Sequence, residues 1–104
     1  MLKLINLFSD SDKLEGVKSY KTWKHLIEST LIYNELWQEI CDGDIKTNKP
    51  TNVTSLAKWE VKNAKALALI MSSVNDEMYI HIEKTSYAWS SLHTFKDLFD
   101  TQPE

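Results

Sequence analysis

The side chains that could bind a soft metal ion or act as a nucleophile are few in this sequence: His25, His81, His93 and Cys41. Structural zinc sites need pairs of Cys or His at close spacing, and no such pair occurs here. The sequence HIE at 81–83 matches the start of a zinc-deaminase signature, but the PCxxC that completes this signature is missing. We therefore expect no bound metal and no cofactor.

Phosphate binding and catalysis are also weakly supported by the residue pattern. Gly16 and Gly43 stand alone, so no glycine-rich loop can hold a phosphate. Asp42 and Asp44 could bind a cation weakly, but the spacing of a calcium-binding loop is absent, and a solvated turn is the simpler interpretation. A dyad of Cys41 with a histidine, as in a small enzyme domain, is an alternative of low specificity. The sequence predicts no catalytic residues and no enzyme.

The composition favours a small helical domain. A chain of 104 residues suits one domain with one modest core, and 42% of its residues are hydrophobic. Two Gly and two Pro are too few for a turn-rich β-sandwich. We expect an all-α fold, a small bundle of about five helices with a short extended N-terminal arm.

Charge and cysteine content bound the partners and the compartment. The net charge is −3, and all twelve basic residues are lysines. Without arginine, the chain lacks the planar side chain used for bidentate phosphate and guanine contacts, so nucleic-acid binding is expected to be weak or indirect. One cysteine excludes an intrachain disulfide, and no run of residues is long enough for a membrane span. These features predict a cytoplasmic protein without a membrane partner.

Two segments are expected, an arm over 1–18 and a helical domain over 19–104. The arm is a candidate interaction segment, because it carries five large apolar side chains ahead of the first helix. Ser19 is the expected N-cap of that helix, and a bend near Asn34 separates it from a second short helix. The apolar side chains of the arm are Leu2, Leu4, Ile5, Leu7 and Phe8.

Three further helices follow a polar loop over 41–53. Thr54 or Ser55 is expected to cap the first of them, and Ser73 or Asn75 the short helix DEMYIHIEK. Thr85 or Ser86 is expected to cap the last helix, YAWSSLHTFKDLF.

Apolar residues at steps of three and four define the predicted core. All four tryptophans lie on such stripes, so burial is the simpler interpretation of them than a binding platform. The predicted core residues are Trp23, Leu26, Ile27, Leu31, Trp37, Ile40, Trp59, Ala66, Leu67, Ile70, Ile80, Trp89, Leu92 and Phe95.

Short motifs in a fixed order cover roughly residues 14 to 99. They are LEG at 14–16, SY at 19–20, Trp23, Leu31, LW at 36–37, Ile40, WE at 59–60, Ala64, ALA at 66–68, Ile70, SVNDE at 73–77, Ile80, Ile82, Thr85, AW at 88–89 and Leu92. This order resembles the Gag polyproteins of copia-type LTR retrotransposons. Ser19 stands where the family more often has Asn, and Ala88 adjoins Trp89 where the family more often separates the two residues.

The resemblance implies a structural role. It suggests the N-terminal lobe of a capsid region, or a captured gene derived from one, which associates with copies of itself or with other Gag chains into virus-like particles. The alternative is a captured module that binds a peptide or protein partner, or interferes with particle assembly. A small enzyme based on Cys41 is the weakest of the three expectations.

Overall fold

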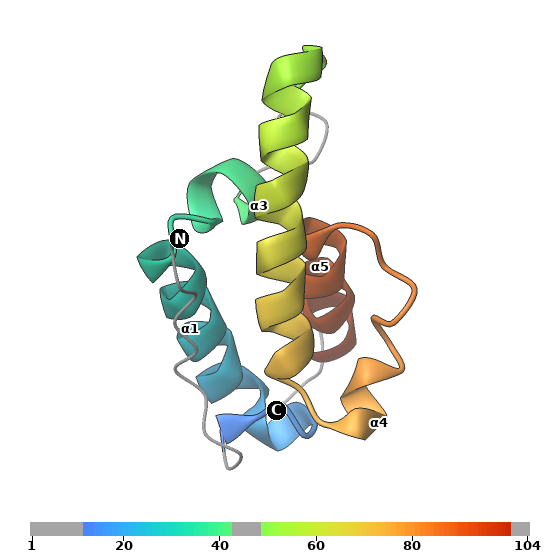
Figure 1. Cartoon of the computed structure of the whole chain (residues 1–104). Coiled ribbons are helices and arrows are strands. Elements are labelled where there is room, and N and C mark those ends of the chain that lie inside the picture. The colour runs from blue at the N-terminus through green and yellow to red at the C-terminus, as the bar shows by residue number, and fades with distance from the viewer. Residues whose placement is uncertain (1–11, 43–48, 101–104) are drawn as a thin grey trace.

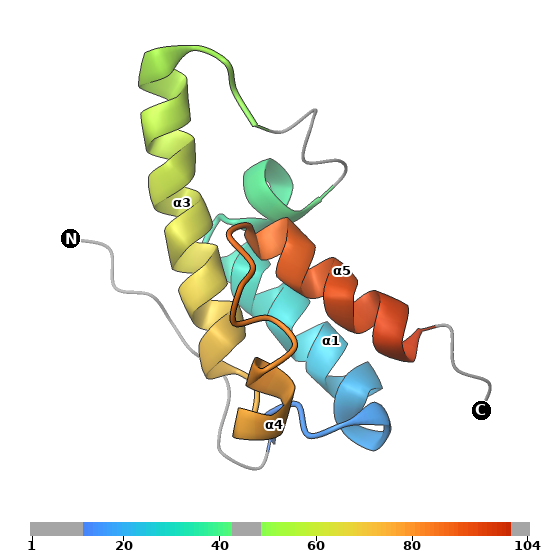
Figure 2. The same ribbon diagram turned by 90° about the vertical axis from the view of Figure 1, so that its right-hand side faces the viewer.

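The computed structural model describes residues 12–42 and 49–100, and the regular structure in these ranges is helical. This confirms the predicted all-α fold with about five helices. Helix α3 is the longest; it lies in front, between α1 and α5, in Figure 1, and the turned view of Figure 2 shows it at one edge of the described structure with α1, η2 and α5 on its other side. The elements are α1 (Val17–Tyr33), the π-helical turn η2 (Trp37–Cys41), α3 (Val53–Ser72), α4 (Asp76–Tyr79) and α5 (Ala88–Phe99).

The last residues of the predicted arm belong to the helical domain. Leu14 is fully buried, and its backbone N–H donates to the carbonyl of Ser73 at 2.9 Å. Its own carbonyl accepts from the N–H of Asn75 at 3.0 Å, which fastens this segment to the connection between α3 and α4. The five apolar side chains of the candidate arm, from Leu2 to Phe8, lie outside the described residues.

Helix α1 begins at Val17, and Gly16 is its N-cap, so the prediction of Ser19 as the cap is wrong. The Ser19 hydroxyl instead lies inside the first turn, where it accepts from the N–H of Glu15 at 2.9 Å and donates to the carbonyl of Gly16 at 3.2 Å. The hydroxyl thus closes the turn that leads into the helix.

The bend predicted near Asn34 is confirmed, and its hydrogen bonds form a Schellman motif. Leu36 N–H donates to the carbonyl of Leu31 at 2.8 Å, and Glu35 N–H donates to the carbonyl of Ile32 at 3.0 Å. Leu31 and Leu36 are both buried, as the hydrophobic contact of this motif requires. Glu35 takes the left-handed position with φ of 61°, where glycine is the usual residue.

Asparagines cap two of the later helices. The Asn52 side chain accepts from the backbone N–H groups of Thr54 and Ser55 at 3.0 and 3.2 Å, so α3 begins before the predicted caps, which are wrong. Asn75 accepts from Met78 N–H at 2.9 Å, which confirms one of the two caps predicted for α4.

Helix α5 receives its cap from another helix. The predicted caps Thr85 and Ser86 are wrong, because α5 begins at Ala88 after Tyr87, and no side chain within the segment caps it. The Asn63 side chain of α3 instead accepts from Ala88 N–H at 2.9 Å and donates to the Ser86 carbonyl at 2.8 Å. This one amide binds the start of α5 to the middle of α3.

Most predicted core residues lie in or against the core. Leu26 and Trp89 are not among the side chains that pack against the core cluster, and Ile80 is 66% exposed, so the prediction for Ile80 is wrong. Helix α4 ends at Tyr79 and the chain continues in turns, so the helical period fails there and Ile82 is buried instead. Of the others, Leu26, Trp37, Leu67, Trp89 and Leu92 are partly exposed. The buried ones are Trp23, Ile27, Leu31, Ile40, Trp59, Ala66, Ile70 and Phe95.

Candidate functional site

The three histidines and the cysteine do not assemble into one site. His25 and His81 are exposed, and among residues 12–42 and 49–100 no three His, Cys, Asp or Glu side chains converge as a metal site would need. His93 stacks on Trp89 with ring centroids 3.7 Å apart, and its Nδ1 lies 2.9 Å from the Trp89 carbonyl. The His93 ring therefore packs within its own helix, and together with Cys41 it also lines the cavity described below.

Cys41 is buried and its thiol is held in the protonated form. Burial, together with the negative charge of Asp42, raises the pKa of the Cys41 thiol to about 12. Because the thiolate and not the thiol is the nucleophile, the environment of this cysteine opposes the nucleophilic role considered for it. Asp44, the other acidic residue of the loop, lies outside the described residues.

A cavity of about 310 Å³ lies between α1, η2 and α5. One of its lining residues, Lys24 of α1, pairs with Asp100 at 3.1 Å. Burial raises the pKa of the nearby Tyr20 phenol, and the charge of Asp100 and a hydrogen bond to it act in the same direction, so the phenol is neutral. The cavity could accept an apolar side chain of a partner. Charged side chains of Lys24, Glu28, Asp42 and Lys96 also line the cavity, and its less polar wall includes Trp23, Ile27, Trp37, Cys41, Leu92 and the ring of His93.

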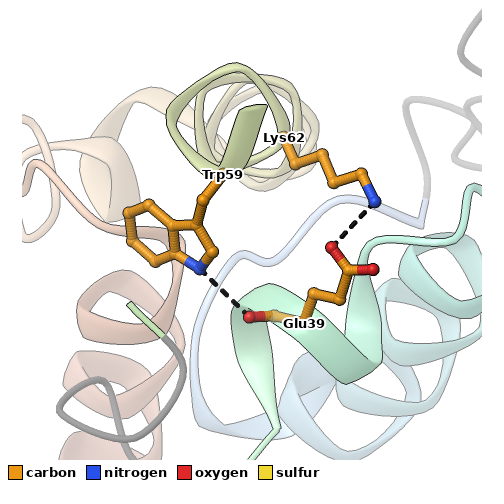
Figure 3. Close-up of polar contacts among 3 residues, drawn as sticks. All are labelled: Glu39, Trp59 and Lys62. Atoms are coloured by element: carbon orange, nitrogen blue, oxygen red, sulfur yellow. Dashed lines mark hydrogen bonds and ion pairs between the residues drawn. The ribbon is translucent and has the colours of Figure 1, made fainter. Parts of the chain in front are cut away.

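A second contact joins η2 to α3 (Figure 3). The indole N–H of Trp59 donates to the backbone carbonyl of Glu39 at 3.1 Å, and the Lys62 ammonium lies 2.8 Å from the Glu39 carboxylate. Trp59 is only 3% exposed, whereas the lysine and glutamate side chains are solvated, so the ion pair itself contributes little to stability. The indole hydrogen bond is the part of this contact that fixes η2 on α3.

The side of α3 that faces away from the core is apolar and exposed. At about 100° per residue, its members fall within roughly 80° of the helix circumference, and the buried residues of α3 lie on the opposite side. Val53 and Val61 are 83% and 56% exposed. We call this surface the outer face of α3; its members, all exposed, are Val53, Ala57, Val61, Ala64 and Ala68.

Sequence reasoning assigned Ala66 of this helix to the core and missed the outer face. Its members are spaced by four, four, three and four residues, the same period that identified the core stripe. A helix with two apolar stripes is the signal that could have found it. The end of α1 adds exposed apolar surface at Ile32 and Tyr33, which are 54% and 65% exposed.

Among the described residues, none of the helices combines the length and the apolar character that a membrane crossing requires. No protein-family model, curated protein or solved structure matches this chain. Three features of the chain bear on its function: the outer face of α3, the cavity between α1, η2 and α5, and the ordered motifs of the sequence.

Proposed function

We propose that this chain is a non-enzymatic assembly module that associates with copies of itself. The observation that carries the proposal is the outer face of α3, which leaves two valines and three alanines in solvent along a helix whose opposite side is buried in the core. Contiguous apolar surface of this kind usually marks a contact with another protein.

The ordered motifs support the same role. They resemble the N-terminal capsid lobe of copia-type Gag polyproteins, a family that builds particles from repeated contacts between identical chains. A weak contact is sufficient in such an assembly, because each copy is held by several neighbours at once. On this proposal the module acts in the cytoplasm, and its contact with nucleic acid is weak or indirect.

The second candidate is a module that binds a peptide or protein partner, or that blocks particle assembly. The cavity between α1, η2 and α5 favours it, because Trp37 and Leu92 line a hollow of about 310 Å³ that one apolar side chain can enter. This candidate predicts a monomer with a ligand, whereas the first predicts an oligomer without one.

Light scattering coupled to size exclusion, run over a wide range of protein concentration, separates the two candidates. We expect the average mass of the chain to rise with concentration, and Val61→Asn to abolish the rise. Ile80→Asn is the matched control, since Ile80 is 66% exposed but lies outside α3. A chain that stays monomeric at every concentration contradicts self-assembly. A peptide selected by display, whose binding is lost in Trp37→Ala, would then support the second candidate.

Deleting residues 1–8 tests whether the apolar arm, rather than α3, carries the association. If α3 carries it, the truncated chain keeps its concentration-dependent oligomer. A truncated chain that folds but remains monomeric would assign the contact to Leu2, Leu4, Ile5, Leu7 and Phe8. A chain that loses stability at every concentration would show that the arm packs on its own domain.

A further inference from the structure

We infer that two copies pair through the outer face of α3 with their α3 helices parallel, related by a two-fold axis that runs along the helices. This inference rests on the proposed self-association and adds to it the partner, the orientation and the charged residues that select that orientation. The partner is a second copy of the chain because the apolar stripe can pack against the same stripe of another copy. The charges on one flank of the stripe are also opposite in sign to those on the other flank.

The spacing of the stripe fits a helix pair. Ala57, Val61, Ala64 and Ala68 follow one another at intervals of four, three and four residues, which is the seam pattern of two helices that cross at a shallow angle. The alanines allow the two axes to approach to about 8 Å. Figure 2 shows α1, η2 and α5 on one side of α3, and the members of the stripe are exposed, so these elements leave the approach open.

The charges beside the stripe distinguish the two orientations. Glu60 lies on one flank of the stripe, and Lys58 and Lys65 lie on the other. In a parallel two-fold pair each flank meets the opposite flank of the second copy, so Glu60 meets the second copy's Lys65, five residues further along, and the contact occurs twice. In an antiparallel pair each flank meets itself, which places Lys58 beside the second copy's Lys65. Attraction in one case and repulsion in the other favour the parallel pair.

Both residues have their charges available for this contact. Within the described part of the chain, neither Glu60 nor Lys65 takes part in an ion pair, whereas Lys62, on the inner side of the same helix, is paired with Glu39 at 2.8 Å. The lysine that is paired within the chain and the lysine assigned to the second copy thus occupy different sides of α3.

Charge reversal in the full chain, followed by sedimentation equilibrium, tests the orientation. Glu60→Lys and Lys65→Glu should each raise the dissociation constant of the dimer on the order of tenfold, because each converts two attractive contacts into repulsive ones. The double variant should recover most of the loss, because the reversed charges again face each other. Melting curves at low concentration verify that the monomer fold is unchanged. If Lys65→Glu strengthens the dimer, the pair is antiparallel and the inference is wrong.

Oxidative cross-linking gives an independent readout. In the parallel pair, the thiol introduced by Ala57→Cys lies opposite the same thiol of the second copy across the two-fold axis. The two thiols can therefore form an intermolecular disulfide. In an antiparallel pair centred on the stripe, the two positions are about 16 Å apart along the helices and no disulfide forms. The parent chain, whose only cysteine is the buried Cys41, is the control. A parent chain that never dimerises contradicts the proposed function; a dimer that neither cross-links at position 57 nor responds to charge reversal contradicts only this inference.

Discussion

Trp23 and Trp59 differ from Trp37 and Trp89 in what surrounds their rings. The first two are 1% and 3% exposed, and each indole N–H donates to another element, Trp23 to the Ser73 hydroxyl at 2.9 Å and Trp59 to the Glu39 carbonyl at 3.1 Å. The other two keep part of their surface in solvent. The comparison shows that two of the tryptophans join separate segments of the chain, whereas the other two are only partly buried, Trp37 against the core cluster and Trp89 beside His93 of its own helix.

Trp23 also shows how an indole ring is buried without leaving its N–H group unpaired. The Ser73 hydroxyl that accepts from its indole donates in turn to the Ile70 carbonyl at 2.7 Å, so donor and acceptor are both satisfied. The ring packs edge-on against Phe95 with centroids 5.3 Å apart. One side chain of α1 thereby contacts both α5 and the end of α3.

Replacing the buried pair should have the largest effect. Trp23→Ala and Trp59→Ala each remove a large buried ring and leave a cavity and an unpaired polar group, at a cost of about 3–5 kcal/mol in the free energy of unfolding. Urea denaturation of purified protein measures this, and Trp→Phe at each site retains most of the volume as a control. An alanine variant with parental stability would contradict the assignment of that tryptophan to the core.

The partly exposed pair should cost less. Trp37→Ala and Trp89→Ala remove rings that are still in contact with water, so we expect losses of about 1–2 kcal/mol in the same denaturation experiment. Trp37 lines the cavity, and its loss should affect partner binding more than stability if the second candidate function holds. A loss at Trp89 as large as that at Trp23 would remove the distinction between the two pairs.

The dryness of the cavity wall beside Trp37 can be tested through Cys41. Burial raises the pKa of its thiol from an ordinary 9.0 to about 12, so the folded state keeps the proton while the unfolded chain loses it. The contribution of the protonated thiol to the free energy of unfolding is fully present below pH 9 and is lost as pH rises from 9 towards 12. By pH 10 the loss should reach about 1 kcal/mol.

The measurement compares the free energies of unfolding of the parent and Cys41→Ala by urea denaturation between pH 8 and pH 10. The range ends at pH 10, the ordinary pKa of Tyr20, because the pKa of that phenol is also raised. The stability advantage of the parent over the variant should narrow across this range. An advantage that stays constant would mean that the thiol ionises normally and that water reaches the wall of the cavity.

The features of the fold that depend on local periodicity could be predicted from the sequence. The features that depend on contacts between residues distant in the sequence could not. Stripes at steps of three and four located the helices and the buried tryptophans, and the bend near Asn34 was predicted although Glu35 occupies the glycine position there. The start of α5 could not be predicted, because its cap is Asn63, a residue of α3.

The exposure of Ile80 and the burial of Ile82 were not predicted, for a related reason. Both fit an apolar pattern in DEMYIHIEK, and only the ending of α4 at Tyr79 decides which of them turns inward. Partial burial of Trp37 and Trp89 follows the same principle, since a periodic stripe places a ring on the inner side of its helix but does not say whether another element covers it.

The smallest expected effect concerns the turn that separates the helix of Trp23 from the turn of Trp37. Glu35 has φ of 61°, a conformation that costs a residue with a side chain about 1 kcal/mol. Glu35→Gly removes that cost but gives the unfolded chain more freedom, so we expect a net gain of roughly 0.5 kcal/mol. Glu35→Ala is the control, because it removes the charge and keeps the strain, and it should give no gain. Thermal unfolding of the three proteins measures the difference. Equal gains in both variants would trace the effect to the charge of Glu35, and a loss in the glycine variant would mean that the backbone at this turn is not strained.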